Sequence, residues 1–169
     1  MKTIIVTGTP GTGKSALARH LAKTARFLYI DVNFIIALKK LGKGFDLERK
    51  CQIIDEKQLR KALLDLIQLH TKKRSRGIII DSHLSTCLPR SKVDLCIVTT
   101  CSLKTLQKRL KKRRYSEEKI RENLDCEIFD VCLMDAQKKK YPVLVIDASG
   151  PLQKTIRRLL MQNDLISIW

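Results

Sequence analysis

One stretch near the amino terminus constrains this chain more than any other. Residues 8–15 read Gly-Thr-Pro-Gly-Thr-Gly-Lys-Ser, which matches the pattern G-x-x-x-x-G-K-[ST]. The β-branched run 3–7 before it predicts a buried strand, and the run 16–23 after it predicts an amphipathic helix. A strand, a glycine-rich loop and a helix in this order surround a phosphate group with backbone N–H groups and the positive end of the helix. The alternative is a glycine-rich turn with a chance lysine, and both flanking elements argue against it.

The chemistry of such a loop assigns roles to its side chains. Lys14 can reach the β- and γ-phosphates of a nucleoside triphosphate, and the Ser15 hydroxyl can bind Mg²⁺. The glycines let the backbone approach the phosphates without a Cβ in the way. The predicted nucleotide-binding residues in this region are Gly11, Thr12, Gly13, Lys14, Ser15 and Ala16.

Alternating strands and helices predict one α/β domain. The chain has 169 residues, of which 44% are hydrophobic, and this suits a single domain (1–169) with a substantial core. Five strands are expected, at 3–7, 27–31, 77–81, 95–99 and 142–147. Helices between them imply a P-loop NTPase fold, a five-stranded parallel sheet with helices on both faces.

The apolar spacing between the strands predicts the helices. A helix is expected over 32–41, followed by an irregular insertion over 42–54. Asp55 is expected to cap the next helix, with Gln58 completing a capping box. The later helices are expected to turn three sets of residues inward: Leu103, Leu106 and Leu110; Ile120, Leu124, Ile128 and Val131; and Leu152, Ile156, Leu159 and Leu160.

An aspartate at the end of the strand 77–81 is a second chemical landmark. Ligands collect at the carboxyl ends of parallel strands, where Asp81 is expected to lie near the phosphate loop. Its carboxylate is expected to orient the Mg²⁺ shell, so Ser15 and Asp81 are the predicted metal residues. His83 lies two residues further on and can point to the same side. From the residues alone, an exposed turn histidine is the favoured interpretation of His83.

Two segments interrupt the expected core, about 31–54 after the second strand and about 112–122 between two helices. A phosphate-loop core with two such appendages is the plan of nucleoside monophosphate kinases. In that plan one appendage binds the acceptor (the NMP-binding insertion), and the other, the lid, closes over the donor and excludes water. Arg113 or Arg114 in the basic lid is suited to brace the transferring phosphoryl group. The alternative for this basic cluster is a solvated helix end.

The charge balance bears on partners rather than on fold. The chain has 34 basic and 17 acidic residues, a formal net charge of +17. Such a field favours polyanions such as nucleotides or RNA, and a merely solvated basic face is an equal alternative. No apolar run approaches the ~18 residues of a membrane span and no signal peptide precedes the first strand, so no membrane association and a cytoplasmic or nuclear location are expected. Six cysteines without a C-x-x-C pair predict reduced thiols rather than a zinc site.

Four groups of residues together resemble the adenylate kinase isoenzyme 6 family. They are residues 7–15, 44–46 with 53–56, 81–83, and 113–119 with 126–128. The resemblance implies an atypical, broad-specificity adenylate kinase that uses ATP and Mg²⁺, takes AMP as acceptor and is also an ATPase. It further implies a role in maturation of the small ribosomal subunit, with a subunit precursor and a platform ribosomal protein as partners. The catalytic residues that it implies are Lys14, Asp81, His83 and Arg113, with His83 tied to ATP hydrolysis and Arg113 contacting ATP.

The chain departs from the family pattern at two positions. Arg114 stands where the lid of the family usually has glycine, and Ala37 stands where the family often has an arginine for the acceptor phosphate. The second departure makes AMP kinase activity less secure than ATP binding and hydrolysis. Two other functions stay open: a kinase for another nucleotide or small metabolite, and an RNA-binding module with a relic loop. The intact Lys14, Ser15 and Asp81 argue against the relic.

Overall fold

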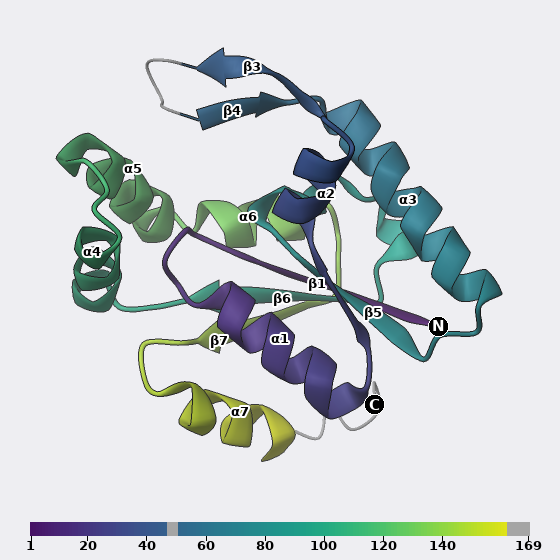
Figure 1. Cartoon of the computed structure of the whole chain (residues 1–169). Helices are drawn as coiled ribbons and strands as arrows, with labels where there is room; N and C mark the ends of the chain where they lie inside the picture. Colours follow the sequence, from purple (N-terminus) through teal and green to yellow (C-terminus); the bar gives the residue numbers. More distant parts are fainter. Residues whose placement is uncertain (47–50, 162–169) are drawn as a thin grey trace.

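The computed structural model describes residues 1–46 and 51–161, and its centre is a five-stranded parallel sheet. The strand order is β2-β5-β1-β6-β7, so the strand before the phosphate loop lies in the middle (Figure 1). Their bounds are β1 Lys2–Gly8, β2 Leu28–Asp31, β5 Gly77–Asp81, β6 Leu95–Thr100 and β7 Val143–Asp147. The predicted fold class is thereby confirmed.

The central strands are continuous apolar runs because helices cover both faces of the sheet. On one face, Ile4 and Val6 of β1 pack in a cluster with Leu17 of α1 and Ile156 of α7. On the other face, Ile5 packs in a cluster with residues of α3 and α6. Figure 1 shows α1 and α7 together on one side of the sheet and α3 and α6 on the other. This layering leaves the carboxyl ends of the strands free to carry a site.

The helices are α1 Lys14–Ala25, α2 Val32–Leu38, α3 Glu56–Lys72, α4 Leu103–Lys112, α5 Glu117–Ile128, α6 Val131–Lys138 and α7 Leu152–Met161. The Asp55 side chain caps α3 by accepting hydrogen bonds from the backbone N–H groups of Lys57 and Gln58. The backbone N–H of Asp55 itself donates to the carbonyl of Leu41, so the reciprocal half of the expected capping box is replaced by a contact to the preceding segment. Short 3₁₀ helices occupy His83–Cys87 and Arg90–Lys92.

The segment after β2 differs from the prediction in two ways. The helix expected over 32–41 ends at Leu38, because Lys40 takes a left-handed conformation with φ of 50°. The expected irregular insertion contains an antiparallel pair, β3 Gly42–Asp46 and β4 Cys51–Ile54. Two glycines and a shift of register between them hid the period-2 pattern of β3.

Two other helix predictions are wrong in detail. Leu103 is 42% exposed because it lies at the first position of α4, whereas Leu106 and Leu110 are fully buried as expected. The helix expected to continue to Val131 ends at Ile128, and both of these residues are exposed. Asp130, with φ of 49°, breaks the chain into α5 and α6. The side chains of Leu159 and Leu160 lie outside those described.

Two further features concern the cysteines and the apolar character of the helices. The five cysteines whose side chains are described, three buried and two half-buried, are free thiols. Within residues 1–46 and 51–161, no helix has the length and apolar character that crossing a bilayer requires.

Candidate active site

The phosphate loop joins β1 to α1 in a backbone shape that requires glycine. Gly8, Gly11 and Gly13 have φ values of 143°, 101° and 107°, which side-chain-bearing residues rarely adopt. At Gly8 a Cβ would also lie 2.4 Å from the carbonyl oxygen of Thr99 on β6. The loop therefore rests directly on the neighbouring strand, and the helix begins at once with Lys14.

Thr12 stabilises the loop through hydrogen bonds of its side chain. Its hydroxyl donates to the carbonyl of Thr9 at 2.8 Å and lies 2.7 Å from the hydroxyl of Thr99. The side chain is completely buried, so of the predicted nucleotide-binding residues it is the one that faces the protein interior. Lys14 and Ser15 are half-buried and Ala16 is exposed at the start of α1.

Arg109 of α4 also stabilises the loop, through hydrogen bonds to its backbone carbonyl oxygens. Its guanidinium donates to the carbonyl oxygens of Thr12 at 3.0 Å and of Gly11 at 3.4 Å. It also donates to the carbonyl of Ala148, in the segment after β7, at 2.8 Å. One guanidinium thus ties α4 to the phosphate loop and to the end of β7. No sequence pattern predicted this role, because Arg109 lies in a run of cations whose members look alike.

Asp81 lies at the end of β5, beside the loop. Its Oδ2 accepts a hydrogen bond from the Tyr29 hydroxyl of β2 at 2.8 Å. Its Oδ1 is buried and has no hydrogen-bond partner among the described residues. A buried carboxylate oxygen without a donor is suited to a cation or to the water shell of one, so the donor set fits Mg²⁺.

Tyr29 is a second residue of the site that no sequence pattern predicted. Burial raises the pKa of its hydroxyl to about 12, so the group stays protonated and can only donate to Asp81. The guanidinium of Arg19 lies 5.3 Å from the centre of the Tyr29 ring. A tyrosine in a short strand has many structural roles, and only the alignment of β2 beside β5 assigns it to Asp81.

The pKa of Lys14 depends on its burial and on the charges around the loop. Burial lowers the pKa of its ammonium group, the nearby Arg113 lowers it further, and Asp81 raises it. The structure therefore brings together three of the predicted catalytic residues, Lys14, Asp81 and Arg113. Arg113 caps the end of α4, which places the start of the lid within electrostatic reach of the phosphate loop.

A cavity of about 680 Å³ reaches His83, two residues after Asp81. One face of α2 lines it with Asn33 and Ala37, and β4 lines it with Gln52 and Ile54. Its remaining wall comes from α3, from the 3₁₀ helix His83–Cys87 and from α6, and it includes Glu56, Leu59, Thr86, Asp135 and Lys139. The cavity thus lies between the predicted acceptor insertion and the core.

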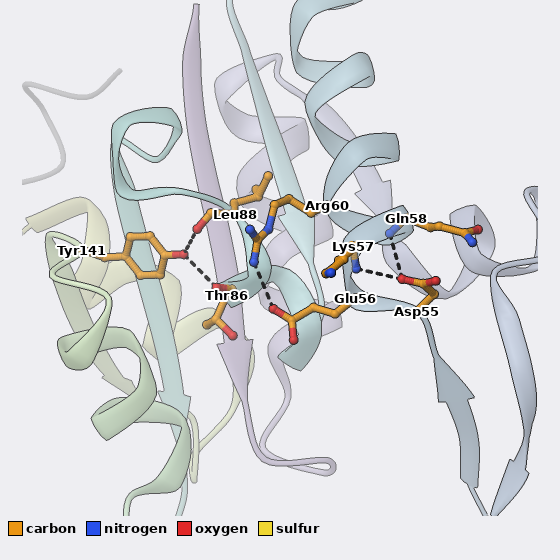
Figure 2. A network of polar contacts seen from close by, with 8 residues as sticks. All are labelled: Asp55, Glu56, Lys57, Gln58, Arg60, Thr86, Leu88 and Tyr141. Carbon is orange, nitrogen blue, oxygen red and sulfur yellow. Dashed lines mark hydrogen bonds and ion pairs between the residues drawn. The ribbon is translucent and has the colours of Figure 1, made fainter.

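A polar network supports the wall of this cavity (Figure 2). The Tyr141 hydroxyl donates to the carbonyls of Thr86 and Leu88, which pins the 3₁₀ helix against the core. Arg60 donates to Glu56 at 3.3 Å, one turn along α3. Figure 2 also shows Asp55 capping the end of α3 that carries Glu56.

Comparison with known proteins decides the family. A family model described as an AAA domain matches residues 4–130. The adenylate kinase isoenzyme 6 homolog of Caenorhabditis elegans is 37% identical over 135 residues, which cover 80% of this chain and 72% of that protein. The homolog of Dictyostelium discoideum is 35% identical over 144 residues, covering 85% of this chain and 79% of its own length. The chain belongs to the adenylate kinase isoenzyme 6 family.

Solved structures agree with this assignment at the level of the fold. A sugar kinase from Janibacter superposes with a TM-score of 0.64 at 15% identity, covering 97% of this chain and 95% of that one. Shikimate kinase from Bacteroides thetaiotaomicron superposes with a TM-score of 0.59 at 14% identity, covering 97% and 99%. The fold of this adenylate kinase isoenzyme 6 family member is therefore that of P-loop kinases.

His83 lies between the phosphate loop and the cavity. It is exposed, begins the 3₁₀ helix after β5 and lines the cavity. Although part of the ring is open to solvent, the protein atoms crowded around it disfavour the charged form and lower its pKa, and the charges of Lys14 and Lys119 lower it further. The imidazole is therefore neutral at pH 7 and lies close enough to the phosphate loop to sense Lys14.

The two departures from the family pattern have structural counterparts. Arg114 has φ of 58°, so the position at which the family usually has glycine does take a left-handed conformation here. Ala37 is exposed on the face of α2 that lines the cavity, so its methyl group offers the cavity no charge. Lys139 is the cation among the cavity-lining residues that the structure describes, beside the two carboxylates of Glu56 and Asp135.

Proposed function

We propose that this protein is a broad-specificity nucleoside monophosphate kinase that transfers the γ-phosphoryl group of ATP to AMP, giving two molecules of ADP. The observation that carries the proposal is the position of the cavity. His83 lines it two residues after Asp81, and both Asp81 and His83 lie within electrostatic reach of Lys14 in the phosphate loop. A donor site next to an acceptor-sized cavity is what phosphoryl transfer requires.

On the donor side, we propose that the loop N–H groups, Lys14 and Arg113 bind the phosphates of ATP. Ser15 and Asp81 would hold Mg²⁺, which when bound neutralises charge on the β- and γ-phosphates. The unpartnered Oδ1 of Asp81 supports this assignment, and Tyr29 keeps the carboxylate oriented through its other oxygen. Lys14 shares its phosphate contacts with Arg113, since the transferring group spreads negative charge over several oxygens.

We also propose an ATPase activity that depends on His83. A neutral imidazole can accept a proton from water, and the lowered pKa of His83 keeps the ring neutral at pH 7. Its position between the loop and the cavity would let it act on water that occupies the acceptor side. Hydrolysis and transfer would then compete for the same γ-phosphoryl group.

The position of the cavity and of Arg113 also assigns roles to the two segments that interrupt the core in the sequence. Residues of about 31–54 would bind the acceptor, because α2 and β4 line the cavity. Residues of about 112–122 would form the lid, because Arg113 lies near Lys14. Closure of the lid would exclude water and favour transfer over hydrolysis.

Assistance to small ribosomal subunit maturation is the cellular role that we propose. The family resemblance supports it, and the net charge of +17 is suited to contact with RNA in a subunit precursor or with a platform ribosomal protein. A cytoplasmic or nuclear location belongs to the same proposal. Filter binding of RNA against increasing salt tests the RNA contact, since phosphate contacts give a steep salt dependence.

The kinase and ATPase proposals are tested together by measuring ADP production with and without AMP. Wild-type protein should produce ADP faster when AMP is added, and Lys14→Ala should abolish both rates. His83→Ala should lower the rate without AMP. If AMP adds nothing to the rate with ATP alone, the kinase proposal fails; if His83→Ala hydrolyses ATP normally, the ATPase mechanism fails.

One observation favours a second candidate, a kinase for another nucleotide or small metabolite. The cavity wall has two carboxylates and one ammonium group, whereas an acceptor phosphate is best held by guanidinium groups. A screen of acceptors against ATP distinguishes the two candidates, because an alternative kinase would show a higher kcat/KM with an acceptor other than AMP.

A further inference from the structure

We propose that Gln52 of β4 binds the base of the acceptor nucleotide and that Gly42 of β3 sets the position of the Gln52 amide. The inference rests on the proposed acceptor role of the cavity, and it identifies the residue that selects the acceptor. Four observations carry it: strand alternation, a close approach of backbone and side chain, an unpartnered amide, and the direction that phosphoryl transfer imposes on the acceptor.

The alternation of β4 turns Gln52 toward the cavity. Successive side chains of a strand point to opposite faces, so Gln52 and Ile54 share a face and Ile53 points away. Gln52 and Ile54 both line the cavity, and Ile53 is 50% exposed. The hairpin therefore presents one polar and one apolar side chain to the ligand space.

Gly42 fixes where the amide of Gln52 lies. Gly42 pairs with Ile54, so it is a diagonal neighbour of Gln52 on the same face of the hairpin. A Cβ on Gly42 would lie 1.9 Å from Nε2 and 2.7 Å from Cδ of Gln52. The amide thus packs directly on the backbone of Gly42, and any larger residue there would displace it. Gly44, two residues further on the same strand, has nothing within 4 Å of its Cβ position.

The amide of Gln52 is available to a ligand. Within residues 1–46 and 51–161 it makes no hydrogen bond, and it lies against the backbone of Gly42 at the edge of the cavity. An amide presents one donor and one acceptor side by side, and the amino group and ring nitrogen of adenine present the complementary pair. Asn33 of α2 adds a second amide to the cavity wall.

The orientation of the acceptor nucleotide in the cavity follows from the chemistry of phosphoryl transfer. Its phosphate must approach the γ-phosphoryl group near Lys14. His83 marks that end of the cavity because it follows the carboxyl end of β5, the strand that pairs with β1 before the phosphate loop. The base must then lie toward the other end, which the hairpin β3–β4 lines; Figure 1 shows this hairpin beyond α2 as seen from the sheet. Ile54 and Leu59 supply apolar surface there for a flat ring.

The experiment compares two glycine variants on one strand. In steady-state assays, Gly42→Ala should raise KM for AMP relative to KM for ATP by about 10-fold, because the amide loses its position and its pair of hydrogen bonds with the base. Gly44→Ala is the matched control and should change this ratio less than about 2-fold, since its methyl group enters open space. Melting curves of both variants identify any change that reflects folding alone.

A ligand analogue provides a second test that does not depend on the fold of Gly42→Ala. Purine riboside 5′-monophosphate lacks the amino group of AMP, so the wild type should bind it about 10-fold more weakly than AMP. Gln52→Leu should bind the two ligands about equally, because the group that distinguishes them is gone.

The outcomes separate this inference from the proposed function. AMP-dependent ADP formation with the same KM ratio in the wild type and Gly42→Ala, or discrimination against the analogue that survives Gln52→Leu, overturns the inference and leaves the kinase intact. Absence of AMP-dependent ADP formation in the wild type overturns the proposed function, and the inference with it.

Discussion

The phosphate loop and the cavity, which we propose as the donor and acceptor sides of the site, are built in opposite ways. On the donor side, hydrogen bonds within the protein hold the phosphate loop: Thr12 bonds to Thr9 and Thr99, and Arg109 bonds to three carbonyl oxygens. The Oδ1 of Asp81 beside the loop is left for a cation. On the acceptor side, the amides of Asn33 and Gln52 line a cavity without hydrogen bonds to the described part of the chain. The phosphate loop is therefore pre-organised, whereas the amide groups that line the cavity have no hydrogen-bond partner in the described part of the chain.

Backbone conformation follows the same division. The three glycines of the phosphate loop all have positive φ, whereas Gly42 and Gly44 of the hairpin do not. The donor glycines are needed for the shape of the backbone, and Gly42 is needed for the space that it leaves to Gln52. Substitution should therefore damage folding on the donor side and ligand selection on the acceptor side.

The largest effect is expected from Gly8→Ala on the donor side. The new Cβ would meet the carbonyl of Thr99 at 2.4 Å in a backbone with φ of 143°, so we expect a loss of roughly 3 kcal/mol in the free energy of unfolding. Urea denaturation measures it, with Gly44→Ala as the acceptor-side control that should lose little. Equal stability of the two variants would remove the distinction between the two classes of glycine.

Tyr29→Phe comes next and tests the donor side without disturbing its backbone. Asp81 would lose the hydroxyl that orients it, so the Mg²⁺ concentration for half-maximal activity should rise roughly 10-fold. Tyr141→Phe is the counterpart on the acceptor side, where the hydroxyl bonds to backbone carbonyls. It should lower the melting temperature and leave the Mg²⁺ requirement as in the wild type; the opposite pattern would contradict the role of Tyr29.

Arg114→Gly should stabilise the protein by about 1 kcal/mol, because glycine adopts a φ of 58° without the steric cost that arginine has there. Arg113→Gly is the matched comparison: with φ of −82° at that residue, glycine relieves no strain and should destabilise. Thermal unfolding of both variants checks the prediction. A lower melting temperature for Arg114→Gly would show that the side chain contributes more than the backbone loses.

The smallest effect concerns His83, which borders both sides. Its folded pKa lies below the unfolded value of about 6.5, so the folded state takes up its proton later than the unfolded state as the pH falls. This group therefore disfavours folding as the pH drops below about 6.5 and has no such effect above it. His83→Gln should lose less stability than the wild type between pH 7 and pH 5 in urea titrations. Parallel curves would mean that the ring is not desolvated in the folded state.

Much of the secondary structure was predictable because it depends on local patterns. Asp55 caps its helix as expected, and the five strands lie where apolar runs indicated. The hairpin β3–β4 was missed because glycines break the alternation, and the break at Asp130 was missed because no glycine or proline marks it. The roles of Arg109 and Tyr29 could not be predicted, because their partners are 97 and 52 residues away in sequence.

The sequence by itself determined the phosphate loop, Asp81 at the end of its strand and the family resemblance, because each is a pattern within a few consecutive residues. Only the tertiary structure decided which cation braces the loop, which hydroxyl orients Asp81 and which amide faces the cavity. The physical reason is that these contacts depend on strand order and helix packing. The order β2-β5-β1 brings Tyr29 beside Asp81 and Asp81 beside the loop, and no local pattern in the chain encodes that order.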